Sequence, residues 1–181
     1  MATKIIAHRG ASYEAPENTL IAVNLAWQLG ADGVEVDVRL TKDAQIVVFH
    51  DATTRRYNGH YKQISRCTYA ELHNLDVGIL KGDEFRGERI PLLSQVINTI
   101  PKGKILVIEV KSGPGIVTHL KKLLDNSNLN HDLVKFISFK RDTIKMLKNK
   151  MPEYDALRIY ELRQMPLLNR TIPSLKILFR H

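Results

Sequence analysis

The sequence predicts an α/β protein built around a parallel β-sheet. Short apolar segments of strand character alternate along the chain with amphipathic helical segments, which is the pattern of βαβ units. Residues 105–111 form a near-continuous apolar run, typical of a parallel strand that is buried on both faces. Polar residues follow the ends of the first strands, where barrel enzymes and doubly wound folds both place their sites. The pattern does not distinguish a barrel from a doubly wound fold.

The expected elements can be read in chain order from apolar periodicity and breaker residues. We expect strands over residues 4–7, 33–40, 46–49, 105–111, 133–139 and 156–162. We expect helices over residues 20–29, 68–75, 90–100, 115–124 and 141–150. The turn between the second and third strands is short, so the third strand should return antiparallel to the second. Residues 52–90 are polar and irregular, which indicates a functional insertion or lid.

Length and composition limit the class of protein. A chain of 181 residues is long enough for a single domain with a substantial core. A single cysteine excludes an internal disulfide and favours a reducing compartment, so a cytoplasmic protein is expected. There is no apolar run of the roughly 18–20 residues that a membrane span needs, and the N-terminus lacks the apolar core of a signal peptide.

The net charge of +8 is concentrated in residues 119–181, which hold 13 Lys and Arg against 6 Asp and Glu. Such asymmetry can indicate contact with nucleic acid or a membrane surface. However, these basic residues fall at helical spacings, and no aromatic residues are interleaved with them as single-strand binding would favour. We therefore expect a solvated helix face and no nucleic-acid partner.

The strand over residues 33–40 carries alternating side chains. Glu35, Asp37 and Arg39 fall on one face, because successive side chains of a strand point to opposite sides. The two acids lie about 6–7 Å apart along the strand and repel each other unless a positive group lies between them. This face is either an ordinary polar face or half of a metal site, depending on what else converges there.

Seven chemically capable residues should meet at one end of the sheet. They are Glu35, Asp37, Glu109, His8, His50, Arg9 and Lys111. Carboxylate oxygens favour Mg²⁺ or Ca²⁺ over zinc. Paired histidines can act as general acid and base, and the two cations suit an anionic substrate such as a phosphate. Together these residue types indicate metal-assisted phosphoester chemistry.

The same residues lie within a series of motifs that resembles the signature of the glycerophosphodiester phosphodiesterases. The motifs are His8-Arg9-Gly10, Glu17-Asn18-Thr19, Glu35-Val36-Asp37, Leu40-Thr41-Lys42-Asp43, His50-Asp51 and Glu109-Val110-Lys111. They occur in that family's order and spacing, and the similarity extends over roughly residues 4–162. Six linked motifs make the resemblance specific.

The resemblance implies a TIM barrel with a small insertion at about residues 52–90. It implies one divalent cation, Mg²⁺ or Ca²⁺, held by Glu35, Asp37 and Glu109. His8 and His50 would then be the acid and base, with Arg9 and Lys111 on the substrate phosphate. The implied reaction releases glycerol 3-phosphate and an alcohol from a glycerophosphodiester by way of a cyclic phosphate, as part of lipid and glycerol metabolism.

The chain departs from this family near its end. A closed eight-stranded barrel takes about 250 residues, whereas we expect about five parallel strands in a single domain over residues 1–181. The sheet would then remain open along one side, and self-association into a homo-oligomer is one way to cover it. Two alternatives to the leading function stay open: a related phospholipase or sphingomyelinase D-like lyase that stops at the cyclic product, and an inactive truncated remnant.

Overall fold

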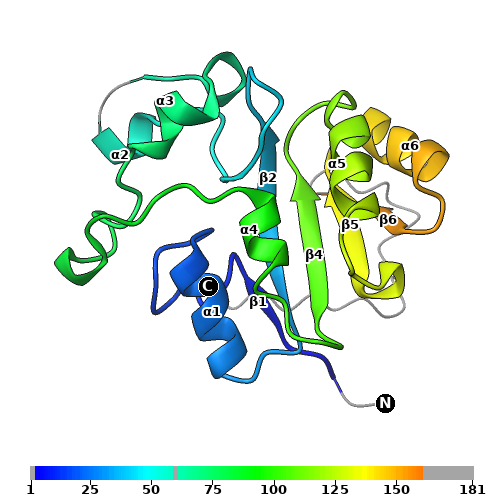
Figure 1. Cartoon of the computed structure of the whole chain (residues 1–181), viewed down its shortest axis with the longest axis horizontal. Coiled ribbons are helices and arrows are strands. Elements are labelled where there is room, and N and C mark those ends of the chain that lie inside the picture. The colour runs from blue at the N-terminus through cyan, green and yellow to red at the C-terminus, as the bar shows by residue number, and fades with distance from the viewer. Residues whose placement is uncertain (1–2, 59–60, 161–181) are drawn as a thin grey trace.

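A computed structural model of the chain describes residues 3–58 and 61–160 (Figure 1). Its centre is a six-stranded sheet in which five strands are parallel, as the sequence predicted. The strands are β1 (Ile6–His8), β2 (Gly33–Leu40), β3 (Ile46–Val48), β4 (Ile105–Val110), β5 (Val134–Ser138) and β6 (Asp155–Arg158). The parallel strands lie in the order β1-β2-β4-β5-β6, which is their order in the sequence, and β3 pairs antiparallel with β2. Successive strands as neighbours are the arrangement of a (β/α) barrel wall.

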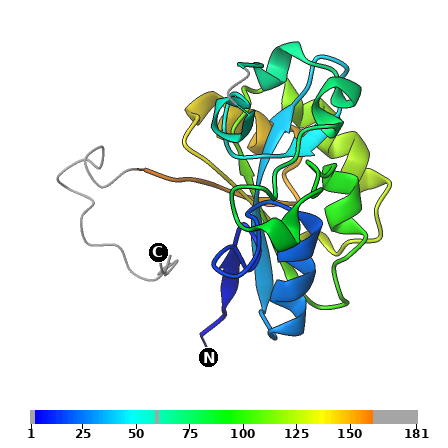
Figure 2. The same ribbon diagram turned by 90° about the vertical axis from the view of Figure 1, so that its left-hand side faces the viewer.

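The α-helices connect the strands. They are α1 (Leu20–Gln28), α2 (Arg55–Asn58), α3 (Tyr69–His73), α4 (Leu93–Ile97), α5 (Ile116–Asp125) and α6 (Arg141–Lys150). Within residues 3–58 and 61–160, three 3₁₀ turns accompany them, namely η1 (Ile64–Arg66), η2 (Asp83–Phe85) and η3 (His131–Leu133). In the view of Figure 2, α1 and α4 lie on the same side of β1 and β2. Among the described residues, none of the helices has the length and hydrophobicity of a membrane span.

Most element ends differ from the prediction by one or two residues, and two elements, α4 and β6, differ more. The helix expected over residues 90–100 begins at Leu93, because Pro91 and Leu92 are taken up by pairing with β3. The Pro91 carbonyl accepts a hydrogen bond from the Val48 amide at 2.8 Å, so this stretch is extended. Strand β6 begins at Asp155 and ends at Arg158, and the last two residues of its expected range, 161 and 162, lie outside the described residues.

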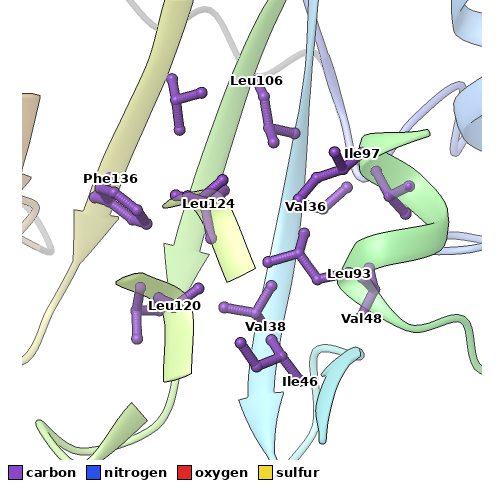
Figure 3. Packing of buried hydrophobic residues seen from close by; sticks show 14 of the residues in the cluster. Val36, Val38, Ile46, Val48, Leu93, Ile97, Leu106, Leu120, Leu124 and Phe136 are labelled. Atoms are coloured by element: carbon purple, nitrogen blue, oxygen red, sulfur yellow. The ribbon is translucent and has the colours of Figure 1, made fainter. Parts of the chain in front are cut away.

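The valines of β2 face the helices, as their alternation predicted. Val36 and Val38 pack with residues of β4, α4 and α5 in the main core (Figure 3). A second core lies under the 52–90 segment, where residues of η1 and α3 pack against Val47 and Phe49. This second core fixes the segment to the strand that leads into His50.

The register between neighbouring strands aligns polar side chains on the face of the sheet opposite the valines. His8 of β1 lies beside Glu35 of β2, and Asp37 lies beside Glu109 of β4. His8 and Glu109 lie at the carboxyl ends of β1 and β4, and the parallel register places Glu35 and Asp37 of β2 beside them. The fold therefore brings together side chains that are up to 101 positions apart (109 − 8) in the sequence.

Candidate active site

The turn after β1 is shaped for close packing against α1. Arg9 and Gly10 both have positive φ angles, 57° and 78°. A Cβ on Gly10 would lie 2.6 Å from the backbone carbonyl carbon of Ala22 in α1, so only glycine fits there. The turn directs the Arg9 amide to Glu35 Oε2, with an N···O distance of 3.0 Å. Backbone geometry thus connects the first strand to the acidic cluster.

Glu35, Asp37 and Glu109 form a compact buried cluster of carboxylates. Their side chains each offer an oxygen within 4.8 Å of the others, and the residues are 3%, 0% and 7% exposed. Within the described residues, Glu35 Oε1 is buried and has no hydrogen-bond donor. An acceptor oxygen that is buried without a donor is costly unless a positive group satisfies it.

The pKa values of the three acids reflect this crowding. Burial raises the pKa of Glu35 to about 8, and the charges of Asp37 and Glu109 add to the rise. Burial also raises the pKa of Glu109, against the opposing effect of the Lys111 ammonium. The pKa of Asp37 is lowered although burial opposes this, because Lys111, the Asn18 amide and Arg9 all stabilise its charge. The cluster therefore has a surplus of negative charge that a cation would relieve.

These residues fit a divalent cation. The donor set consists of carboxylate oxygens alone, which suits a hard ion such as Mg²⁺ or Ca²⁺. The Glu35 oxygen without a donor and the raised pKa values indicate a site that positive charge would stabilise. Glu35, Asp37 and Glu109 together can hold a metal ion.

Two cations adjoin the cluster. Lys111 Nζ lies 2.6 Å from Glu109 Oε1 and 3.1 Å from Asp37 Oδ1. Arg9 Nε lies 3.1 Å from Asp37 Oδ2, and Arg9 Nη1 lies 2.8 Å from Glu17 Oε2. Both side chains are largely buried, so their charges are felt strongly at this end of the sheet.

The two histidines stand at the same rim and are partly open to solvent. His8 Nε2 lies 3.8 Å from Glu35 Oε2. His50 Nδ1 lies 2.8 Å from Asp51 Oδ1, and a carboxylate can only accept, so Nδ1 carries the hydrogen. This leaves His50 Nε2 with a lone pair in the neutral ring, which is the form of a general base. Arg39 donates two hydrogen bonds to the His50 carbonyl, at 2.9 and 2.6 Å, and so fixes the backbone at this residue.

Several supporting residues were not assigned roles from the sequence. Asn18 is buried, has a φ of 59°, and bonds Asp37 through both its amide oxygen and its nitrogen. Arg56 of α2 bonds Asp51 and Glu17. The Pro16-Glu17-Asn18-Thr19 stretch ahead of a helix was the available signal for Asn18, whereas nothing in the sequence alone distinguishes Arg56 from its neighbour Arg55.

A cavity of about 740 Å³ lies elsewhere in the molecule. It is lined by residues of α4, by the end of α5 and by the loops that precede β4 and β5. These loops enter the strands at their amino ends, so the cavity is at the opposite end of the sheet from the carboxylates.

Comparison with known proteins agrees with this arrangement. The model of the Glycerophosphoryl diester phosphodiesterase family matches residues 8–177. The chain belongs to this family. It is 40% identical over 166 residues to a glycerophosphodiester phosphodiesterase of Caldanaerobacter subterraneus, covering 89% of this chain and 68% of the relative. The family resemblance inferred from the six motifs is confirmed.

Solved members of the family share the fold. A phosphodiesterase of Oleispira antarctica in complex with the product sn-glycerol-3-phosphate superposes with a TM-score of 0.77 at 36% identity, over 86% of this chain and 64% of that one. A glycerophosphodiester phosphodiesterase of Agrobacterium tumefaciens gives a TM-score of 0.75 at 31% identity, over 86% and 66%. The chain thus spans about two thirds of the length of these family members. The predicted TIM-barrel class is confirmed, and the described strands form part of such a barrel.

Proposed function

We propose that this protein hydrolyses glycerophosphodiesters to glycerol 3-phosphate and an alcohol in a metal-dependent reaction. The observation that carries the proposal is the buried cluster of Glu35, Asp37 and Glu109, placed beside two cations and two histidines at one end of the sheet. The Oleispira antarctica relative, solved with sn-glycerol-3-phosphate, supports this substrate class.

In this proposal the three carboxylates hold one divalent ion, Mg²⁺ or Ca²⁺. When bound, the ion would supply positive charge to the phosphate oxygens. Arg9 and Lys111 would bind the same phosphate from the side of the protein, because charge-assisted hydrogen bonds to phosphate are short and strong. The pairing of both cations with Asp37 keeps their side chains oriented before a substrate arrives.

His8 and His50 would move the protons. The glycerol hydroxyl next to the phosphate attacks phosphorus as one histidine accepts its proton, and the other histidine protonates the departing alcohol oxygen. The bond to the alcohol breaks as the cyclic phosphate forms. Water then attacks phosphorus and opens the ring, which leaves glycerol 3-phosphate. The bond between His50 Nδ1 and Asp51 supports His50 as the base, since it leaves Nε2 without a hydrogen.

The test is a turnover assay of this 181-residue chain on glycerophosphocholine, with detection of glycerol 3-phosphate. We expect activity with Mg²⁺ or Ca²⁺, its loss with EDTA, and its restoration by added metal. His50→Ala should lower turnover by at least about 100-fold, the size of a general acid–base contribution. His131→Ala is a matched control because His131 Nδ1 also lies close to a neighbouring carboxylate, that of Asp132 at 3.1 Å.

Each alternative has its own outcome in this assay. Accumulation of the cyclic phosphate without glycerol 3-phosphate would indicate a lyase. A folded, metal-loaded chain without any turnover would indicate an inactive member of the family. Equal activity with and without EDTA would contradict the carboxylate metal site.

A further inference from the structure

A chain of ion pairs joins the candidate base to the candidate phosphate-binding arginine. His50 Nδ1 lies 2.8 Å from Asp51 Oδ1, and Asp51 Oδ2 lies 3.0 Å from Arg56 Nε. Arg56 Nη2 donates to Glu17 Oε1, and the other Glu17 oxygen accepts from Arg9 Nη1 at 2.8 Å. Arg56 stands in the middle of this chain, between two carboxylates.

Each of the two carboxylates uses its two oxygens in the same way. One oxygen of Asp51 holds His50 and the other holds Arg56, while one oxygen of Glu17 holds Arg9 and the other holds Arg56. A carboxylate is planar, so fixing one oxygen fixes the direction of the other. Arg56 therefore sets the orientation of both acids through two nitrogens of one rigid guanidinium group.

The position of Arg56 is itself held by the 52–90 segment. Its guanidinium carbon lies 5.0 Å from the centre of the Tyr57 ring, and its Nη2 donates to the Tyr57 hydroxyl at 3.1 Å. The Tyr57 ring packs at 5.5 Å from that of Phe49, the residue before His50. Burial raises the pKa of Tyr57 to about 12, so its hydroxyl stays neutral and accepts this bond at ordinary pH.

We propose that Arg56 is a positioning residue, which holds His50 and Arg9 in a fixed mutual arrangement through Asp51 and Glu17. The assignment of chemistry to His50 and Arg9 rests on the proposed function, whereas the ion-pair chain itself does not. Without Arg56, Asp51 and Glu17 would no longer share a cation. Asp51 would then be held only through His50 and Glu17 only through Arg9, so the orientation of the His50 ring would be less tightly fixed.

The test compares Arg56→Ala with Arg55→Ala. Arg55 is the neighbouring arginine of the same short helix and is exposed, and among the described residues it makes no ion pair. We expect Arg56→Ala to lower kcat/KM by about 10–100-fold, as loss of an orienting partner behind a functional group does. The loss should lie mainly in kcat, because the orientation of His50 matters for proton transfer, and Arg55→Ala should match the wild type.

Two further measurements separate positioning from general structural damage. Arg56→Lys keeps the charge but has a single ammonium group in place of the planar guanidinium group. Its kcat should therefore lie between those of Arg56→Ala and the wild type. The Arg56 side chain is 42% exposed, so added guanidinium ion should reach the vacant place and raise kcat of Arg56→Ala but not that of His50→Ala.

A spectroscopic measurement tests the positioning without any turnover. In nitrogen-15 spectra of histidine-labelled protein, the His50 ring, assigned by its loss in His50→Ala, should be a single tautomer with the hydrogen on Nδ1. Arg56→Ala should convert it to a mixture of tautomers, and Arg55→Ala should not.

The outcomes distinguish the two proposals. An unchanged His50 spectrum in folded Arg56→Ala, or a kcat within about 2-fold of that of Arg55→Ala, would overturn the positioning role and leave the proposed function standing. A changed spectrum in a protein whose wild type shows no turnover would support the positioning role and overturn the proposed function. If a thermal melt shows that Arg56→Ala does not fold, the nitrogen-15 spectrum and kcat of Arg56→Lys are measured instead. An unchanged His50 tautomer together with wild-type kcat in Arg56→Lys would show that the guanidinium group is not required and would refute the positioning role.

Discussion

Asn18 offers a direct measure of how strongly the acidic cluster is held by its surroundings. The residue is 3% exposed, and its side chain makes two hydrogen bonds with Asp37. Nδ2 donates to Asp37 Oδ2 at 2.9 Å, and Oδ1 accepts from the Asp37 amide at 3.0 Å. Asn18→Ala removes both bonds and leaves a buried amide and a buried carboxylate oxygen short of a partner.

The expected loss of folding free energy in Asn18→Ala can be estimated one hydrogen bond at a time. A hydrogen bond to a charged group contributes about 1.5–3 kcal/mol, and an unsatisfied buried amide costs about 1–3 kcal/mol. Alanine also tolerates the φ of 59° less well than asparagine, which adds about 1 kcal/mol. Allowing for partial relaxation, we expect Asn18→Ala to lower the free energy of unfolding by about 4 kcal/mol. For a protein of this size, that is a decrease in Tm of about 8–16 °C.

The assay is thermal and urea unfolding at pH 7 without divalent cations. Asn18→Gly is a companion variant that loses the same bonds but adopts the positive φ freely, so it should be about 1 kcal/mol more stable than Asn18→Ala. Asn126→Ala is the control, because Asn126 makes an exposed hydrogen bond to the Lys122 carbonyl at the end of α5. If Asn18→Ala were no less stable than Asn126→Ala, the bonds to Asp37 would contribute nothing and the reasoning would be refuted.

Two other predictions concern the same end of the sheet. Gly10→Ala should lower Tm by several degrees more than Gly30→Ala: both glycines have positive φ, but a Cβ on Gly10 would meet the Ala22 backbone at 2.6 Å whereas one on Gly30 meets nothing within 4 Å. Equal melting temperatures would contradict the close approach. Because the pKa of Glu35 is raised from 4.5 to about 8, the folded protein holds a proton that the unfolded chain has released, so stability should fall as the pH rises from about 4.5 to 8. Glu35→Gln should flatten this decline in metal-free unfolding experiments, and an equally steep decline in Glu35→Gln would refute the assignment.

The sequence by itself determined which residues could form the elements and which chemistry they could support. Alternation in residues 33–40 placed Glu35 and Asp37 on the face opposite the valines, because the side-chain period of a strand is two. The short turn after Leu40 required the antiparallel return of β3, which delivers His50 to the site. The six motifs between His8 and Lys111 carried the family resemblance, which the comparisons confirmed.

The sequence could not predict where an element ends when residues far along the chain form hydrogen bonds with its backbone. A helix was expected over residues 90–100, yet Leu92 pairs with Val47 and the helix begins at Leu93. Helix α2 is four residues long and polar, so it has too little periodicity to be recognised from sequence.

Only the tertiary structure decided how the charges of the site are compensated. Glu17 and Asn18 belong to a motif and Arg56 looks like an ordinary polar residue, but the sequence does not show the partners of any of them, which lie up to 39 positions away. The raised pKa of Glu35 likewise follows from burial and from the approach of Asp37 and Glu109, which register between β2 and β4 sets. Side-chain periodicity is a local property that a sequence displays, whereas electrostatic balance depends on distances that exist only after the strands have paired.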